Sequence, residues 1–137
     1  MIVADTSALL ALFNRREPAY EAVRAAVGAE VEPMVVSPYV VAELDYLVGT
    51  RLGIDAELAV LAELAGGAYH LASMPAEQIE RARSVVERYR DLRIGLADAS
   101  LVVLADQYDT RALLTLDRRH FDALRPLAGG HFRLLPA

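Results

Sequence analysis

Apolar residues change their spacing several times along the chain, and each change marks an expected element. Compact apolar runs, typical of buried strands, lie at residues 2–4, 34–36, 68–71, 112–116 and 132–135. Helical spacing of apolar positions lies between them, at residues 8–13, 18–29, 38–52, 55–64, 76–89 and 96–107. Short apolar strands that alternate with helices predict a parallel sheet covered on both faces. We therefore expect an α/β fold, a three-layer α/β/α arrangement with a short central parallel sheet, in a single domain over residues 1–137.

Capping signals predict where several helices begin. Ser37, with a proline after it, supplies a cap and a first-turn proline for one long helix. Asp55 is expected to cap the helix that follows, and Thr6 and Ser7 offer cap chemistry directly after the first strand. Residues 96–107 are apolar nearly all round, which predicts a central buried helix.

Four acidic residues stand at strand ends or among apolar neighbours. Asp5 follows the first expected strand, and Asp117 follows the expected strand at residues 112–116. Parallel strands direct their carboxyl ends to one edge of the sheet, where ligands bind in such folds. Glu43 interrupts a helix surface that its apolar neighbours predict to be buried, and Asp98 lies near the start of the most apolar helix. We expect these four side chains to converge on one pocket.

The cost of burying charge makes this grouping informative. A lone buried carboxylate costs several kcal/mol, so it is normally protonated, paired or bound to a cation. Two Mg²⁺ or Mn²⁺ ions would neutralise four carboxylates, and such hard cations prefer oxygen ligands. Each acid also has a structural explanation when taken singly: Asp5 and Asp117 as helix caps, Asp98 as a favourable charge at a helix N-terminus, and Glu43 as the partner of an arginine. The four together predict a catalytic metal site.

Other polar side chains near the four acids are candidates for substrate contact. Thr6 and Ser7 are expected as helix caps, and alternatively as contacts of a metal-bound water. Arg118 and Arg93 lie in segments expected to border the same sheet edge, where a guanidinium group suits bidentate contact with phosphate. As solvated surface charges they would need no further role. His120 follows the last acid closely enough to approach the rim of the pocket.

Composition removes several classes of enzyme. All 14 basic residues are arginine, and the chain has neither lysine nor cysteine. P-loop NTPases and Schiff-base enzymes are therefore excluded, together with disulfide frameworks and thiol catalysis. The 19 acidic residues give a net charge of −5, so contact with nucleic acid would depend on a local basic patch. The N-terminus lacks the basic segment of a secretory signal, and no apolar stretch could span a bilayer, so we expect a cytoplasmic protein without membrane contact.

Four segments that contain the four acids carry a resemblance to a known family. They are residues 2–10 (IVADTSALL), 37–44 (SPYVVAEL), 96–101 (LADASL) and 114–121 (LTLDRRHF). In their order and spacing over essentially the whole chain, they resemble PIN-domain ribonucleases. Within that family the chain is most similar to the VapC toxins of bacterial type II toxin–antitoxin systems.

The resemblance implies a PIN-like fold and a Mg²⁺-dependent endoribonuclease, with Mn²⁺ as a substitute. The family's acidic positions fall on the same four residues, which would be both catalytic residues and metal ligands. Its hydroxyl position falls on Thr6 or Ser7. The resemblance further implies an RNA substrate, a homodimer in the bacterial cytoplasm, and a VapB-like antitoxin whose tail enters the active groove.

Two other functional classes stay open at this point. A metal-dependent phosphohydrolase of small molecules would use similar acids, whereas an inactive RNA-binding or protein-binding module would not need to bind metal. The helices at residues 38–52 and 55–64 carry more apolar residues than one core contact can use. Surplus apolar surface on a small protein usually marks an interface, so we expect contact with a second copy and a groove for a partner.

Overall fold

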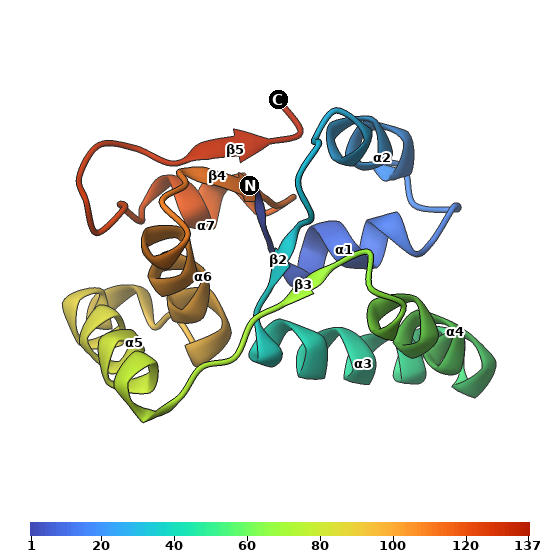
Figure 1. The fold of residues 1–137 in the computed structure, drawn as a ribbon, viewed down its shortest axis with the longest axis horizontal. Helices are drawn as coiled ribbons and strands as arrows, with labels where there is room; N and C mark the ends of the chain where they lie inside the picture. Colours follow the sequence, from blue (N-terminus) through green and yellow to red (C-terminus); the bar gives the residue numbers. More distant parts are fainter.

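The computed structural model describes residues 1–137, and its centre is one parallel sheet of five strands in the order β3-β2-β1-β4-β5 (Figure 1). Neighbouring strands pair in parallel throughout, as the short apolar runs predicted. The bounds are Val3–Ala4 for β1, Val35–Val36 for β2, His70–Leu71 for β3, Ala112–Leu114 for β4 and Arg133–Leu135 for β5.

The strand order reverses between β1 and β4. The chain moves outward from β1 through β2 to β3, and then crosses back to add β4 and β5 on the other side of β1. Val3 consequently pairs with both Val35 and Leu113. In open parallel sheets such a reversal leaves a crevice at the carboxyl ends of the two central strands. The segments that follow β1 and β4 therefore lie where chemistry is expected.

Seven α-helices and one 3₁₀ turn connect and cover the strands. Figure 1 shows α5 and α6 to one side of the sheet and α1 and α2 to the other. No helix combines the length and the apolar composition that are needed to cross a membrane. The bounds are Thr6–Leu12 for α1, Tyr20–Gly28 for α2, Pro38–Leu52 for α3, Ile54–Ala65 for α4, Ala76–Arg88 for α5, Arg90–Leu92 for the 3₁₀ turn η1, Leu96–Gln107 for α6 and Arg118–Asp122 for α7.

One hydrophobic core of 31 buried residues joins the sheet to the helices around it. The strands β1, β2 and β4 are buried at every position. Helix α6 is buried continuously from Ala99 to Ala105, as its all-round apolar sequence predicted. This burial fixes α6 in the core, and Asp98 lies in its first turn, directly before the buried stretch.

Most expected boundaries agree with the structure, and the differences have local causes. Ser37 caps α3 by accepting a hydrogen bond from the Tyr39 N–H, as predicted. The prediction that Asp55 caps α4 is wrong, because Gly53 holds the cap position and the aspartate lies in the first turn. Gly53 has a φ of 94°, a conformation that residues with a side chain rarely adopt.

Helix α1 begins earlier than the apolar spacing indicated. Asp5 holds the N-cap position, so Thr6 and Ser7 form the first helical turn and are not caps. Helix α7 was not predicted, because its five residues carry four polar side chains and no helical period. Phe121, the only buried residue of α7, anchors it to the core.

Candidate active site

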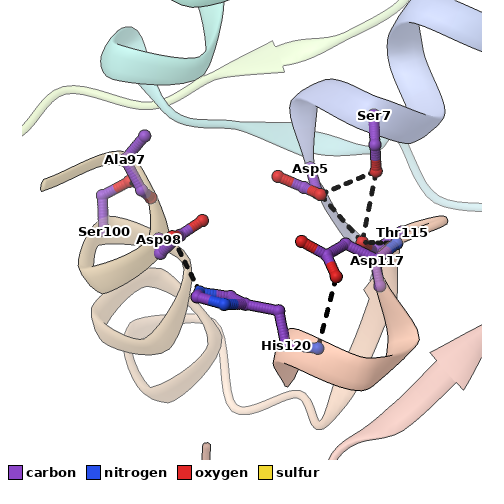
Figure 2. A network of polar contacts seen from close by, with 8 residues as sticks. All are labelled: Asp5, Ser7, Ala97, Asp98, Ser100, Thr115, Asp117 and His120. Atoms are coloured by element: carbon purple, nitrogen blue, oxygen red, sulfur yellow. Dashed lines mark hydrogen bonds and ion pairs between the residues drawn. The ribbon is translucent and has the colours of Figure 1, made fainter. Parts of the chain in front are cut away.

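Asp5 projects from the carboxyl end of β1 into a set of hydroxyl groups. Its backbone N–H donates to the Leu114 carbonyl at 2.8 Å, which extends the pairing of β1 with β4 by one residue. The residue is only 7% exposed. Its Oδ2 accepts hydrogen bonds from Ser7 Oγ and Thr115 Oγ1, each at 2.8 Å (Figure 2). One carboxylate oxygen of Asp5 is thereby fixed by two donors.

The same two hydroxyls fix the segment that follows β4. Ser7 Oγ accepts from the Leu116 N–H, and Thr115 Oγ1 accepts from the Asp117 N–H, both at 3.0 Å. The two hydroxyl oxygens lie 3.3 Å apart. Asp5 and Asp117, which are far apart in the sequence, are therefore held to one another through a single hydroxyl group, that of Thr115.

Asp117 and Asp98 face Asp5 from two further elements. Asp117 is the N-cap of α7, where its Oδ1 accepts from the His120 N–H at 3.2 Å. Asp98 lies in the first turn of α6, and its Oδ2 is 2.9 Å from His120 Nε2. Figure 2 shows the carboxylates of the three aspartates pointing toward one another from β1, α6 and the start of α7. The predicted convergence of these three acids is present in the structure.

Glu43 differs from its expected environment. It lies on α3 and is exposed, so the expectation that it interrupts a buried surface is wrong. The buried face of α3 is formed by Val40, Leu44 and Val48, at helical spacing, and Glu43 lies beside that face. Its charge nevertheless contributes to raising the pKa of Asp5, which places Glu43 within electrostatic range of the aspartates.

A buried pair of serines fixes α3 to α6. Ser37 and Ser100 are both fully buried, and their hydroxyls lie 2.7 Å apart. Ser100 also bonds the Ala97 carbonyl at 2.6 Å. This contact holds the N-terminal ends of the two helices together. Glu43 lies six residues after Ser37 on α3, and Asp98 lies two residues before Ser100 on α6. Sequence reasoning gave Ser100 no role, because a lone serine inside an apolar helix carries no recognisable signal.

Burial dominates the electrostatics of the two central aspartates. It raises the pKa of Asp5, against the lowering effect of the hydrogen bonds from Thr115 and Ser7. Burial also raises the pKa of Asp98, and the negative charges of Asp5 and Glu43 raise it further, while His120 lowers it. Their ionised forms are therefore disfavoured in the fold. Asp117, like Glu43, is exposed, so the burial-cost argument holds for two of the four acids.

The donor set has the chemistry of a site for a hard divalent cation. All four side chains supply carboxylate oxygens, and the like charges of Asp5, Glu43 and Asp98 act on one another. One oxygen of Asp98 and one of Asp117 receive no hydrogen bond from the protein. No three acidic or histidine side chains stand close enough together to enclose an ion. The residues fit the cation by type and by electrostatics.

The residues predicted to contact substrate are two hydroxyl side chains beside Asp5 and two arginines. The Ser7 hydroxyl donates a hydrogen bond to Asp5. Thr6, the residue between them, is buried, and its hydroxyl has no hydrogen-bond partner. Arg93 is exposed after η1, with a left-handed φ of 50°. Arg118 donates to the carbonyls of Leu134 and Pro136, at 3.4 and 2.9 Å, so it holds the C-terminal segment.

The second of the two arginines that follow Asp117 lies beside the acids. Arg119 lines a hollow of about 310 Å³ together with Leu92, Asp117, His120 and Ala123. The hollow thus opens beside two residues of the acidic network. The run of two arginines after Asp117 was the available signal, and only the fold distinguishes which of the two faces the hollow.

Replacing Thr115 by Val tests whether its hydroxyl organises this network. The change leaves the Asp117 N–H and one Asp5 oxygen short of a partner, and we expect a loss of about 1–3 kcal/mol in the free energy of unfolding. It also removes a hydrogen bond that lowers the pKa of Asp5. Urea unfolding measures the loss. The same substitution at the exposed Thr50 is the control, with an expected change below about 0.5 kcal/mol.

Comparison with known proteins identifies the family of this sequence. The sequence pattern described as the PIN domain matches residues 2–125, a range that contains all four acids. The chain belongs to the PIN-domain family. The likeness of the PIN-domain chain to VapC toxins is also confirmed: it is 60% identical over 135 residues to Ribonuclease VapC26 of Mycobacterium tuberculosis (strain ATCC 25618 / H37Rv), covering 98% of this chain and 100% of that protein.

Solved structures confirm the fold of this PIN-domain protein. VapC20 of Mycobacterium tuberculosis, described as a toxin that cleaves the sarcin–ricin loop, superposes with a TM-score of 0.80 at 19% identity, covering 88% of this chain and 92% of that one. The DNA-bound VapBC of Salmonella typhimurium gives a TM-score of 0.66 at 20% identity, covering 98% of each chain. At such identities the likeness establishes the α/β architecture with its parallel sheet.

Proposed function

We propose that this protein is a divalent-metal-dependent endoribonuclease and the toxin of a VapBC-type toxin–antitoxin pair. The observation that carries the proposal is the meeting of Asp5, Asp98 and Asp117 at the reversal point of the sheet, with Glu43 in electrostatic range. The 60% identity to a protein named as a ribonuclease supports RNA as the substrate class.

Each acid has a distinct part in the proposed site. Asp5 and Asp98 supply the central carboxylates, and Glu43 and Asp117 supply further ligands from the more exposed side. A bound Mg²⁺ or Mn²⁺ supplies a Lewis acid that makes water more acidic and stabilises negative charge on phosphate oxygens. The raised pKa values of Asp5 and Asp98 mean that the fold holds negative charge there at a cost, which a cation would offset.

The RNA strand would enter from the side of α7. Arg119 lines the hollow beside Asp117 and is placed to contact a backbone phosphate, as a planar guanidinium group does well. Arg93 and Arg118 remain proposed as contacts further out, and Thr6 remains proposed as a hydroxyl beside the central acid. Since the chain is net negative, these arginines would supply the local attraction that RNA binding needs.

The experiment that tests this function compares substrates and cations directly. A panel of single-stranded and structured RNAs is incubated with the protein in Mg²⁺, in Mn²⁺ and in EDTA, alongside a small phosphodiester. We expect cation-dependent internal cleavage of at least one RNA. Turnover of the small ester without RNA cleavage would favour a phosphohydrolase, and no turnover with no cation binding would favour a binding module.

We also propose a VapB-like antitoxin as a partner. Several structures that share the fold are toxin–antitoxin complexes, among them the VapBC pair from Salmonella typhimurium. An apolar groove of about 520 Å³ between α1, α2 and α4 offers a surface of suitable kind for an apolar segment of such a partner. Its lining residues are Leu12, Phe13, Val27, Ala56, Ala59, Val60, Glu63 and Tyr69.

A homodimer is proposed from the exposed apolar side chains of α3 and α4. Tyr46 on α3 and Ile54 and Leu58 on α4 are 69%, 63% and 57% exposed, and exposed apolar surface of this kind usually marks an interface. We expect light scattering at micromolar concentration to give twice the mass of one chain. Leu58→Glu is expected to give a single-chain mass, whereas Val31→Glu, at a site 99% exposed, leaves the dimer intact. A single-chain mass for the unsubstituted protein would contradict the dimer.

A further inference from the structure

His120 is the one residue that hydrogen-bonds to the carboxylates of two of the acids. Its backbone N–H donates to Asp117 Oδ1, and its ring nitrogen Nε2 lies 2.9 Å from Asp98 Oδ2 (Figure 2). The ring also meets the ring of Phe121 edge-on, with centroids 5.4 Å apart and an interplanar angle of 81°. Since Phe121 is buried, the imidazole is supported from behind by the core.

The three aspartates differ in how their side chains are held. Asp5 accepts from two hydroxyls, and Asp117 accepts from a backbone N–H in the cap of α7. Asp98 has no other hydrogen bond or ion pair from its carboxylate than the one to His120. The orientation of the Asp98 carboxylate therefore depends on a single side chain.

The chemistry of this contact defines which oxygen stays free. When Asp98 is ionised its carboxylate only accepts hydrogen bonds, so the contact then requires that Nε2 carries the proton and donates to Oδ2. Oδ1 of Asp98 is left without a protein donor, on a side chain that points toward Asp5 and Asp117. A donor that fixes one oxygen of a ligand and directs the other inward is the usual arrangement around protein metal sites.

We propose that His120 is a positioning residue that orients Asp98 for binding a divalent cation. The inference rests on the proposed function and adds to the acidic site a residue outside its four carboxylates. His120 acts through Asp98, by the hydrogen bond from Nε2. A histidine that only attached α7 to α6 would affect folding stability and leave cation affinity unchanged once the protein is folded.

The shapes of the amide side chains provide a specific test. Gln at position 120 places its Nε2 amide nitrogen where the histidine Nε2 lies, whereas the Asn amide nitrogen falls short of Asp98. We expect His120→Gln to retain Mn²⁺ affinity within about threefold, measured by calorimetry on the full chain. His120→Asn and His120→Ala are expected to bind Mn²⁺ about 10–100 times more weakly. His131→Ala, at an exposed histidine, is the control and binds as the unsubstituted protein does.

The Mn²⁺ affinities of these variants decide whether His120 positions Asp98. Equal Mn²⁺ affinity in all variants, or equal loss in Gln, Asn and Ala, would overturn a role that depends on the Nε2 hydrogen bond. In RNA cleavage we expect the Asn and Ala variants to lower kcat with little change in KM, and a change in KM alone would point to substrate contact instead. If the unsubstituted protein binds no Mn²⁺, the proposed function fails as well. If it binds and His120→Ala binds equally, only the positioning role fails.

Discussion

Asp98→Asn is expected to lower RNA cleavage by a factor on the order of 100 or more while leaving the cation-free protein at least as stable as before. The change removes one negative charge and nearly preserves shape. The Asn carbonyl oxygen can still accept from His120 Nε2, so the contact between α6 and α7 is retained. What is lost is the negative charge of a proposed cation ligand.

The expected stability of the cation-free Asp98→Asn variant follows from the pKa of Asp98. Burial raises this pKa above the ordinary value of 3.8, so the unfolded chain ionises more readily than the folded protein. The folded state therefore loses stability as the pH rises through the range between the two values. Asn does not titrate. In EDTA, the melting temperature of Asp98→Asn relative to the unsubstituted protein should be lowest in acid and rise toward neutral pH.

The outcome that would contradict this account is a variant that is strongly destabilised but still cleaves RNA. That result would make Asp98 a structural partner and not a catalytic acid. Asp91→Asn is the matched control, because Asp91 is exposed on η1 and forms no ion pair. We expect this control to retain both cleavage and melting temperature.

Divalent cations are expected to have the second large effect. Binding to the folded state alone stabilises it, by about 2.7 kcal/mol when the free cation is at 100 times its dissociation constant. The melting temperature should therefore rise as Mg²⁺ or Mn²⁺ is added, and cleavage should stop in EDTA and return when the cation is restored. Asp5→Asn should reduce this rise in melting temperature, because Asp5 is the most buried of the four acids. Cleavage that continues undiminished in EDTA would contradict a metal-dependent mechanism.

The sequence predicted the sheet and the buried helices well, because their signals are local and strong. Helix α6 has the predicted bounds, Leu96–Gln107, because an all-round apolar run can only be buried. Ser37 capped α3 as expected, since its hydroxyl reaches the N–H two residues on. Helix α7 could not be predicted, because its position depends on the Asp117 cap and on one buried side chain, Phe121.

The sequence predicted that three of the acids, Asp5, Asp98 and Asp117, converge, but it predicted the environment of the four acids only partly. The carboxyl ends of β1 and β4 bring Asp5 and Asp117 together, as parallel topology requires. The exposure of Glu43 was not predictable, because α3 has apolar residues on several faces and only one of these faces is buried. Tyr46, for example, faces solvent. The hydroxyl of Thr115 was also missed, since its importance arises from a contact with Asp5 across the sheet.

The most direct test of the central claim is a calorimetric titration of Mn²⁺ into the cation-free protein, with Asp5→Asn, Asp98→Asn and Asp91→Asn in parallel. If the acids at the sheet reversal form a cation site, the unsubstituted protein and Asp91→Asn bind with the same affinity. Asp5→Asn and Asp98→Asn then bind at least about tenfold more weakly, as expected when a charged oxygen ligand is lost. No saturable binding by the unsubstituted protein, or equal binding by all four proteins, would contradict the claim.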